Sequence, residues 1–249
     1  YYYKYRTTGQ SLDQTFGYKI DWSNGNGYFN TQEELDKYTE GYVDENGVEH
    51  KGITYNLSTA PQLGDFKYID QNGDGIIDEK DRVPIGYTKV PRVSYGLNVS
   101  LNYKWFDFTV FLQGVGKYSS YYSGQGVYEN IYQGTFFKYH KTAWTAERYA
   151  AGQKITYPRL STGETCSKIQ NDFFVMDRAF IRLKAIELGY TLPSNALRAI
   201  GINKLRVYFR GDNLVTWDRL RTSTTDPEQT DQIGYPIVKT FNFGFNVTF

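Results

Sequence analysis

The last ten residues of the chain alternate between apolar and polar side chains without interruption. Phe241, Phe243, Phe245, Val247 and Phe249 occupy one set of positions, and polar residues or glycine occupy the other. Because successive side chains of a strand point to opposite faces, this pattern predicts a strand with one apolar and one polar face. A soluble sandwich also alternates, but an almost wholly aromatic face on a terminal strand is typical of a transmembrane barrel, where lipid covers one face and water the other.

Other segments alternate in the same way, and we expect each of them to be a strand. They cover residues 1–6, 16–21, 93–104, 106–112, 181–190 and 205–212. The alternation changes phase near Ala185, which predicts a β-bulge. A tight hairpin is expected at Lys104 and Trp105, between two of these segments. Burying the charges of Arg206 and Arg210 in a dry core would cost much free energy, whereas placing them beside a hydrated lumen would cost little.

The lengths of the connections carry further information. Short links at about 8–12, 104 and 191–202 alternate with long ones at about 22–92, 114–177 and 214–239. Long structureless loops are uncommon in compact domains, whereas outer-membrane barrels combine short periplasmic turns with long extracellular loops. About seven strands do not close an even-numbered barrel, and an open edge in lipid leaves backbone groups unpaired. We therefore expect an all-β chain that is the carboxy-terminal portion of a transmembrane antiparallel β-barrel.

Composition narrows the functional classes. The net charge of +1 and a charged fraction of 22% give no electrostatic case for a nucleic-acid partner. Cys166 is the only cysteine, so neither an internal disulfide nor a cysteine-rich metal site is expected. The two histidines are not part of a Ser-His-Asp or HExxH arrangement, so we predict no catalytic residues and no enzyme activity.

Residues 70–81, with the sequence DQNGDGIIDEKD, match the spacing of an EF-hand-type calcium loop. The glycine at position 6 permits the sharp turn, and the position-12 ligand is an aspartate in place of the usual glutamate. The predicted Ca²⁺ ligands are Asp70, Asn72, Asp74, the Ile76 carbonyl, Asp78 and Asp81. An acidic, turn-rich loop that holds no metal is the alternative.

A tyrosine-rich segment at 118–139 is the candidate substrate-binding region. Tyr121, Tyr122, Tyr128 and Tyr132 offer ring faces and hydroxyl groups that suit sugar rings or a peptide. The alternatives are that these rings pack the loop against itself or dock a partner protein.

Five sequence runs together resemble one known family. They are GDFKYIDQNGDGIIDEKDRVPIG, RVSYGLNVSLNYKWFDFTVFLQGVG, FIRLKAIELGYTLP, LRVYFRGDNLVTW and YPIVKTFNFGFNVTF. In this order they resemble the carboxy-terminal part of the SusC/RagA-type TonB-dependent outer-membrane transporters of Bacteroidetes. The resemblance extends from about Phe16 to Phe249.

The resemblance implies a 22-stranded barrel in the outer membrane of a Gram-negative bacterium, in contact with lipid and capped by a SusD-like surface lipoprotein. It further implies TonB-dependent import of oligosaccharides or oligopeptides. The plug domain, the first barrel strands and the TonB-contacting segment have no counterpart here, so residues 1–249 are expected to be the carboxy-terminal barrel part, with the 70–81 loop inside an extracellular loop. A calcium-stabilised all-β surface module that binds glycans without transport is the alternative function.

Overall fold

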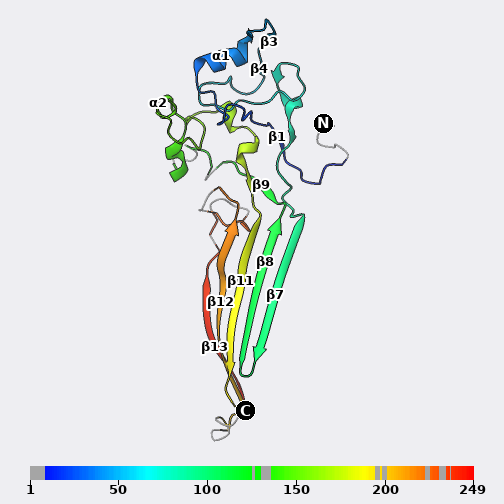
Figure 1. The fold of residues 1–249 in the computed structure, drawn as a ribbon, viewed down its shortest axis with the longest axis vertical. Coiled ribbons are helices and arrows are strands. Elements are labelled where there is room, and N and C mark those ends of the chain that lie inside the picture. The colour runs from blue at the N-terminus through cyan, green and yellow to red at the C-terminus, as the bar shows by residue number, and fades with distance from the viewer. Residues whose placement is uncertain are drawn as a thin grey trace. The chain divides into compact units, whose positions relative to one another are not determined.

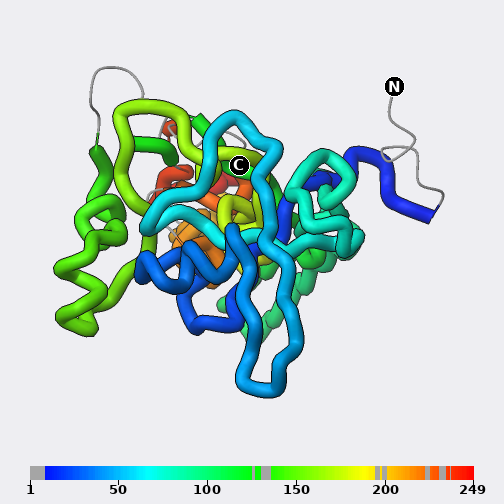
Figure 2. Tube along the Cα trace, turned by 90° about the horizontal axis from the view of Figure 1, so that it is seen from above, coloured from blue at the N-terminus to red at the C-terminus, as the bar shows by residue number. Residues whose placement is uncertain are grey.

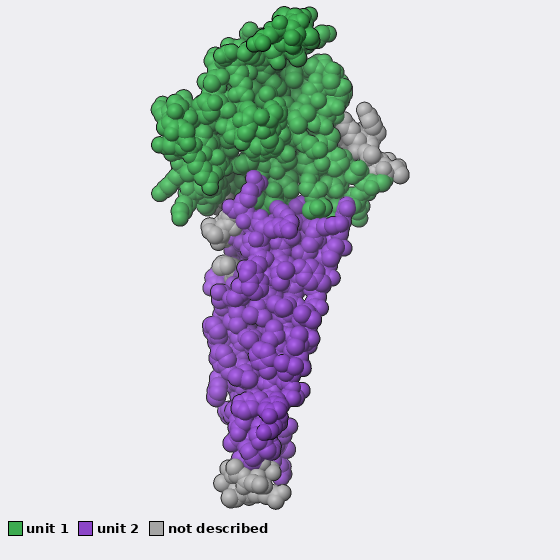
Figure 3. All heavy atoms as spheres, viewed as in Figure 1, with its two compact units in different colours: residues 1–89, 120–176 green, residues 90–119, 177–249 purple. Residues whose placement is uncertain are grey.

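The structure, a computed structural model, describes residues 9–124, 127–129, 136–193, 197, 201–221, 225–229, 234–235 and 237–249. The chain divides into two compact units, coloured separately in Figure 3. Unit 1 comprises Tyr1–Lys89 and Ser120–Met176, and unit 2 comprises Val90–Ser119 and Asp177–Phe249. Within the described ranges, no helix has the length and apolar character needed to cross a membrane.

Unit 2 contains a five-stranded antiparallel sheet in the order β13-β12-β11-β8-β7 (Figure 1). Its strands are β7 (Val93–Tyr103), β8 (Phe106–Gly116), β11 (Phe180–Thr191), β12 (Lys204–Asp218) and β13 (Thr240–Thr248). An 11-residue strand extends about 36 Å at about 3.3 Å per residue. This sheet confirms the all-β, antiparallel class and five of the predicted strands.

The register of the sheet places like residues on one face. Phe209 lies opposite Phe243 on β13 and opposite Leu188 on β11, and Leu188 in turn lies opposite Phe108. On β13, Phe241, Phe243 and Phe245 are between 63% and 75% exposed. An apolar face this continuous and this open is uncommon on a water-soluble monomer.

The links within the sheet follow the predicted pattern. Tyr103 pairs with Phe106, so Lys104 and Trp105 form a two-residue hairpin loop. The amide of Thr191 donates to the carbonyl of Trp105, and that of Asn203 to the carbonyl of Thr248, which places the short links at one end of the sheet. The predicted bulge is also confirmed, because the register shifts between Leu183 and Ala185 on both sides of β11.

Unit 1 is built from short elements and long connections. Its elements are β1 (Phe16–Gly17), α1 (Gln32–Glu40), β2 (Gly41–Val43), β3 (Glu49–Lys51), β4 (Thr54–Tyr55), β5 (Ile76–Ile77), β6 (Val83–Pro84) and α2 (Ala146–Ala150), with single 3₁₀ turns at Glu79–Asp81, Lys138–Thr142, Cys166–Lys168 and Asp172–Phe174. Two further strands, β9 (Ser119–Tyr121) and β10 (Val175–Asp177), pair with each other. Most strand pairs here are two or three residues long, so side-chain packing has to hold the unit together.

The run that begins with Gly64-Asp65-Phe66 forms the centre of unit 1. Phe66 and Tyr68 are buried in an aromatic core, and the Tyr68 hydroxyl donates to the Cys166 carbonyl at 2.7 Å. The buried Asp65 carboxylate accepts from Arg159 Nε and Ser167 Oγ, each at 3.0 Å. Burial raises the pKa of Asp65, although the Arg159 charge opposes that shift. One sequence motif thus ties three distant segments together.

The predicted strand over 16–21 is wrong in its location. Only Phe16–Gly17 forms a strand, paired with β6, and isolated bridges follow at Tyr18 and Ile20. Phe16, Tyr18 and Ile20 pack inside unit 1. Their alternation reflects one buried face of an extended segment rather than a strand of the large sheet. The strand predicted over 1–6 lies outside the described residues.

Gly64 provides a test of this packing. Its φ is +81°, and a Cβ added there would overlap the indole ring of Trp144. We expect Gly64→Val to destabilise unit 1 by about 3 kcal/mol or more, because backbone strain and overpacking add. Gly152→Val is the matched control, since Gly152 also has a positive φ, of +61°, but has open space around it. Hydrogen exchange of unit 1 amides measures both; equal effects of the two variants would contradict the close contact.

Candidate functional site

A helix followed directly by a hairpin forms a concave surface in unit 1. The Thr31 hydroxyl accepts from the Glu34 amide at 3.2 Å and begins α1. Gly41, with φ +87°, ends the helix and begins β2. The Asp44–Val48 turn then reverses the chain into β3, and this hairpin extends from its neighbours in unit 1 (Figure 2).

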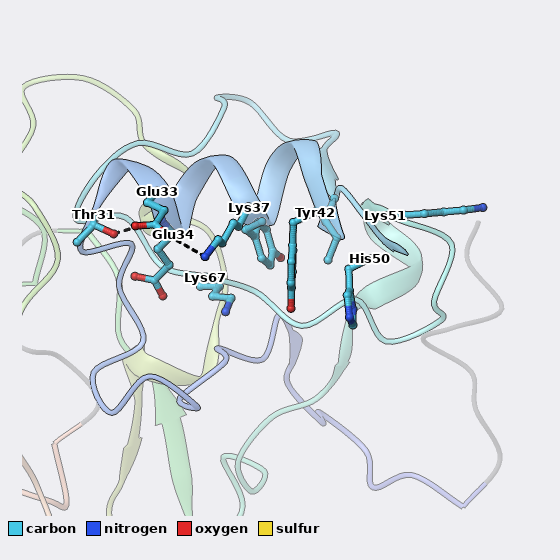
Figure 4. Close-up of a pocket in the computed structure, with 10 residues that line it drawn as sticks. Thr31, Glu33, Glu34, Lys37, Tyr42, His50, Lys51 and Lys67 are labelled. Carbon is cyan, nitrogen blue, oxygen red and sulfur yellow. Dashed lines mark hydrogen bonds and ion pairs between the residues drawn. The ribbon is translucent and has the colours of Figure 1, made fainter. Parts of the chain in front are cut away.

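The cavity between helix and hairpin, here called the helix–hairpin pocket, has a volume of about 550 Å³. Tyr42 and His50 are cross-strand partners whose rings stack with centroids 4.6 Å apart and planes 10° apart. Figure 4 shows both rings side by side at the pocket. Its lining residues are Thr31, Glu33, Glu34, Lys37, Tyr38, Tyr42, His50, Lys51, Ile53 and Lys67.

The charged groups of the pocket are partly paired. Lys37 Nζ lies 2.7 Å from Glu33 Oε1, and Lys67 Nζ lies 3.1 Å from Asp21 Oδ2. The Lys37–Glu33 hydrogen bond raises the pKa of Lys37 and lowers that of Glu33, so both groups are charged at neutral pH. Lys37 also lies 5.9 Å from the centre of the Tyr42 ring. The pocket therefore combines an aromatic surface with ammonium groups.

Sequence reasoning missed this pocket, although a signal was present. Asn46-Gly47 is a strong hairpin signal, but a two-residue Asn-Gly loop would place Tyr42 opposite Lys51. The structure has a three-residue loop from Glu45 to Gly47, which pairs Tyr42 with His50. The contribution of Lys67 carries no such local signal, because it arises from a segment distant in sequence.

The predicted substrate tyrosines lie largely inside unit 1. Tyr122 and Tyr128 are buried, and the hydroxyls of Tyr121 and Tyr128 lie 2.7 Å apart. The Tyr121 hydroxyl also lies 3.2 Å from the Ile169 carbonyl oxygen, and the Tyr128 hydroxyl lies 3.2 Å from that of Lys168. Their packing role is thus clear, while their predicted contact with substrate stays a prediction. Tyr132 lies outside the described residues.

Tyr128 does reach a second cavity of about 500 Å³, which Glu129 and Lys168 also line. The Glu129 carboxylate is buried and lies 2.8 Å from Lys168 Nζ. Lys168 donates in addition to the carbonyls of Ser161 and Gly163. Because the three ammonium hydrogens are already used within unit 1, this ion pair stabilises the fold and offers little to a ligand.

The 70–81 loop is closed by its own hydrogen bonds. Asp70 accepts from the amides of Gly73 and Gly75, both at 2.7 Å. Asp81 is buried and accepts from the amides of Gln71 and Asp78, both at 2.8 Å. Burial raises the pKa of Asp81, and these two hydrogen bonds oppose the shift.

The remaining predicted calcium ligands are engaged in similar ways. Asn72 Nδ2 donates to Asp74 at 2.9 Å, and Lys80 Nζ lies 3.2 Å from Asp74 and 3.5 Å from Asp78. Ile76 belongs to β5. Among the described residues, no three His, Cys, Asp or Glu side chains gather in a metal-binding arrangement. The oxygen-rich sequence suits calcium, but binding would require these contacts to rearrange, so the calcium site stays a prediction.

The polar face of the sheet in unit 2 carries a line of ion pairs across three strands. Arg206 on β12 bonds to Asp107 on β8 and lies 2.7 Å from Glu187 on β11. Arg210 lies 3.6 Å from Glu187 and 2.9 Å from Asp212. Each charge thus has an opposite neighbour, which is how charged side chains are accommodated on a partly exposed sheet face.

A second charged group holds part of the β12–β13 connection on this polar face. Arg182 of β11 is fully buried, and its guanidinium bonds to Asp226 at 2.6 and 2.7 Å and to Glu228 at 2.8 Å. Arg178 Nε donates to the Pro227 carbonyl at 2.9 Å, and its guanidinium lies over the Tyr118 ring. Residues 225–229 are therefore anchored by bidentate, charge-assisted bonds.

This anchor generates a direct test. We expect Arg182→Met to weaken the attachment of residues 225–229 by about 3 kcal/mol, because two carboxylates lose a buried partner. Arg219→Met is the control, since Arg219 is 76% exposed and makes one 3.5 Å ion pair with Asp177. Hydrogen exchange of a peptide covering 225–229 in the full-length protein distinguishes the variants; unchanged exchange in Arg182→Met would show that the anchor lies elsewhere.

Comparison with known proteins shows which family the chain belongs to. No protein-family profile matches the chain. TonB-dependent receptor P26 of Formosa agariphila is 32% identical over 212 residues, which cover 76% of this chain and 20% of that protein. TonB-dependent receptor P3 of the same organism is 28% identical over 230 residues, which cover 82% of this chain and 22% of that protein. The chain spans about a fifth of the length of these relatives.

Solved structures agree on the fold. The RagAB peptide transporter superposes with a TM-score of 0.56 at 19% identity, over 85% of this chain and 21% of that one. The RagAB peptide importer in its closed-closed state superposes with a TM-score of 0.55 at 19% identity, over 95% of this chain and 22% of that one. These relatives are named as receptors and transporters, in agreement with the predicted absence of enzyme activity. The chain therefore belongs to the TonB-dependent receptors, and its fold is similar to part of the RagAB peptide transporter.

Proposed function

We propose that this chain forms wall strands and outer loops of a transporter that imports an oligosaccharide or oligopeptide across the outer membrane, energised through TonB. The observation that carries this proposal is the two-faced sheet of unit 2. Its aromatic face is exposed, as lipid contact requires, and its opposite face carries paired charges that suit a wet lumen.

The ends of the sheet support the same assignment. Trp105 lies in the hairpin at one end of the sheet, and Trp217, which pairs with Ile181, lies near the other. Both indoles are about half exposed, at 46% and 56%. Tryptophan is enriched at both membrane–water interfaces, so two exposed indoles separated along the strands are what a spanning sheet needs.

The same proposal includes the partners. A SusD-like surface lipoprotein closes the outer opening, and TonB acts through a part of the transporter that this chain does not include. The support is the sequence resemblance, together with solved relatives that are described as states of the RagAB peptide importer. The long connections of unit 1 are then extracellular, and the 70–81 loop binds Ca²⁺ there as a rigid brace.

A pair of neighbouring substitutions tests the membrane assignment. Phe243→Lys puts a charge on the apolar face of β13, and we expect it to reduce folded protein in the outer membrane, at a cost of about 2–4 kcal/mol. Asn242→Lys puts the same charge on the polar face, where Asn242 Nδ2 lies 3.3 Å from Asp212, and should be tolerated. Membrane fractionation with gel assays of folded barrel measures both. Recovery of the unmodified protein in the soluble fraction without detergent would overturn the proposal.

The calcium proposal has its own test. Lys80 forms ion pairs with the carboxylates of Asp74 and Asp78, so we expect Lys80→Met to tighten calcium binding. Asp74→Ala removes a predicted ligand and should weaken it. Hydrogen exchange of residues 70–81, with calcium and with EDTA, provides the readout in the full-length protein. Identical exchange under both conditions in all three proteins would leave the loop without a metal role.

A further inference from the structure

We propose that the helix–hairpin pocket binds a sugar residue bearing a carboxylate group, with the ring against Tyr42 and the carboxylate held by Lys37 and Lys67. The cavity of about 550 Å³ lies within the range of small-molecule sites. Because import of a nutrient is itself proposed above, the choice of a sugar as ligand rests on that function. Binding in the pocket can nevertheless be measured without transport.

Tyr42 provides the surface for the ring. One face of Tyr42 is covered by His50, which fixes its orientation, yet the residue as a whole is 43% exposed. A ring already held in place loses little conformational freedom when a ligand stacks on it. The C–H groups of a sugar ring form its apolar faces, and a flat aromatic ring is the protein surface that covers them best.

The hydrogen-bonding capacity of the pocket indicates an anion. Both oxygens of Glu34 already accept bonds, from Asn24 Nδ2 at 2.7 Å and from the Asn30 amide at 3.0 Å. Each ammonium has three donors, and Lys37 and Lys67 each use one on a carboxylate of the described chain. Lys37 and Lys67 therefore have ammonium hydrogens to spare, whereas each Glu34 oxygen already accepts one hydrogen bond.

The geometry places these donors beside the ring. In Figure 4 the ammonium of Lys37 projects beside Tyr42, Lys67 lies below it, and Lys51 points away from the others. The partner of Lys37 is Glu33, which is 77% exposed, so their ion pair is weak and readily shared with a ligand. A peptide of acidic residues would bind the lysines but has no apolar ring face to lie against Tyr42. A sugar acid has both the ring face and the carboxylate, so the sugar is favoured.

The test uses the full-length receptor purified in detergent and three probes: trigalacturonic acid, maltotriose and the tripeptide Glu-Glu-Glu. Calorimetric titration should show binding of trigalacturonic acid that weakens about tenfold in Tyr42→Ala and in Lys37→Gln, and weakens with added salt. Tyr42→Phe keeps the ring and should bind normally. Tyr149→Ala and Lys141→Gln, at exposed positions elsewhere in unit 1, are the matched controls.

Other results would overturn the inference in distinct ways. Equal binding of maltotriose would show a site without anion preference, and binding of Glu-Glu-Glu that depends on Lys37 alone would show a peptide site. Absence of binding by all three probes, or binding unaffected by Tyr42→Ala and Lys37→Gln, would remove the pocket as a site. A receptor that still fractionates with the outer membrane in those cases leaves the membrane assignment intact.

Discussion

Strict alternation of side chains along five paired strands imposes two different surroundings on one sheet. Backbone hydrogen bonds fix the register, and the register aligns Phe108, Leu188, Phe209 and Phe243 on the same face. Once the aromatic positions of one strand lie on one side of the sheet, the register places the apolar positions of its paired strands on the same side. The paired charges on the other face follow from this constraint, because the side chains excluded from the apolar face need water or partners.

Close contacts on the polar face depend on small residues. Gly189 pairs with Tyr208 and with Asp107, and a Cβ there would meet both the Arg206 guanidinium and the Asp107 carboxylate. Gly244 likewise lies beneath the ring of Tyr208 on the adjacent strand. Glycine in a strand interior usually weakens it. Here the missing side chains leave room for an ion pair and for an aromatic ring between neighbouring strands.

Unit 1 is stabilised on a different basis. It has almost no extended pairing, and its cohesion comes from buried aromatic rings together with hydrogen-bonded groups such as Asp65 and Tyr68. This packing holds the long connections in one conformation, and a loop can form a pocket only when its conformation is fixed. The α1–β2–β3 segment, with its stacked Tyr42 and His50, shows how a rigid surface can arise within a region that has few strands.

The sequence by itself determined the large sheet, because a period of two reports directly which residues share a face. It also located the hairpin at Lys104, the bulge near Ala185 and the family, each from a local pattern. Only the tertiary structure decided which of the other aromatic side chains are buried. The sequence around Phe16, Tyr122 and Tyr128 does not show whether these rings face a ligand or a core. They are buried because segments far apart in the chain pack around them. The pocket that joins Tyr42 to Lys67, and the anchor that joins Arg182 to Asp226, depend on the same long-range folding.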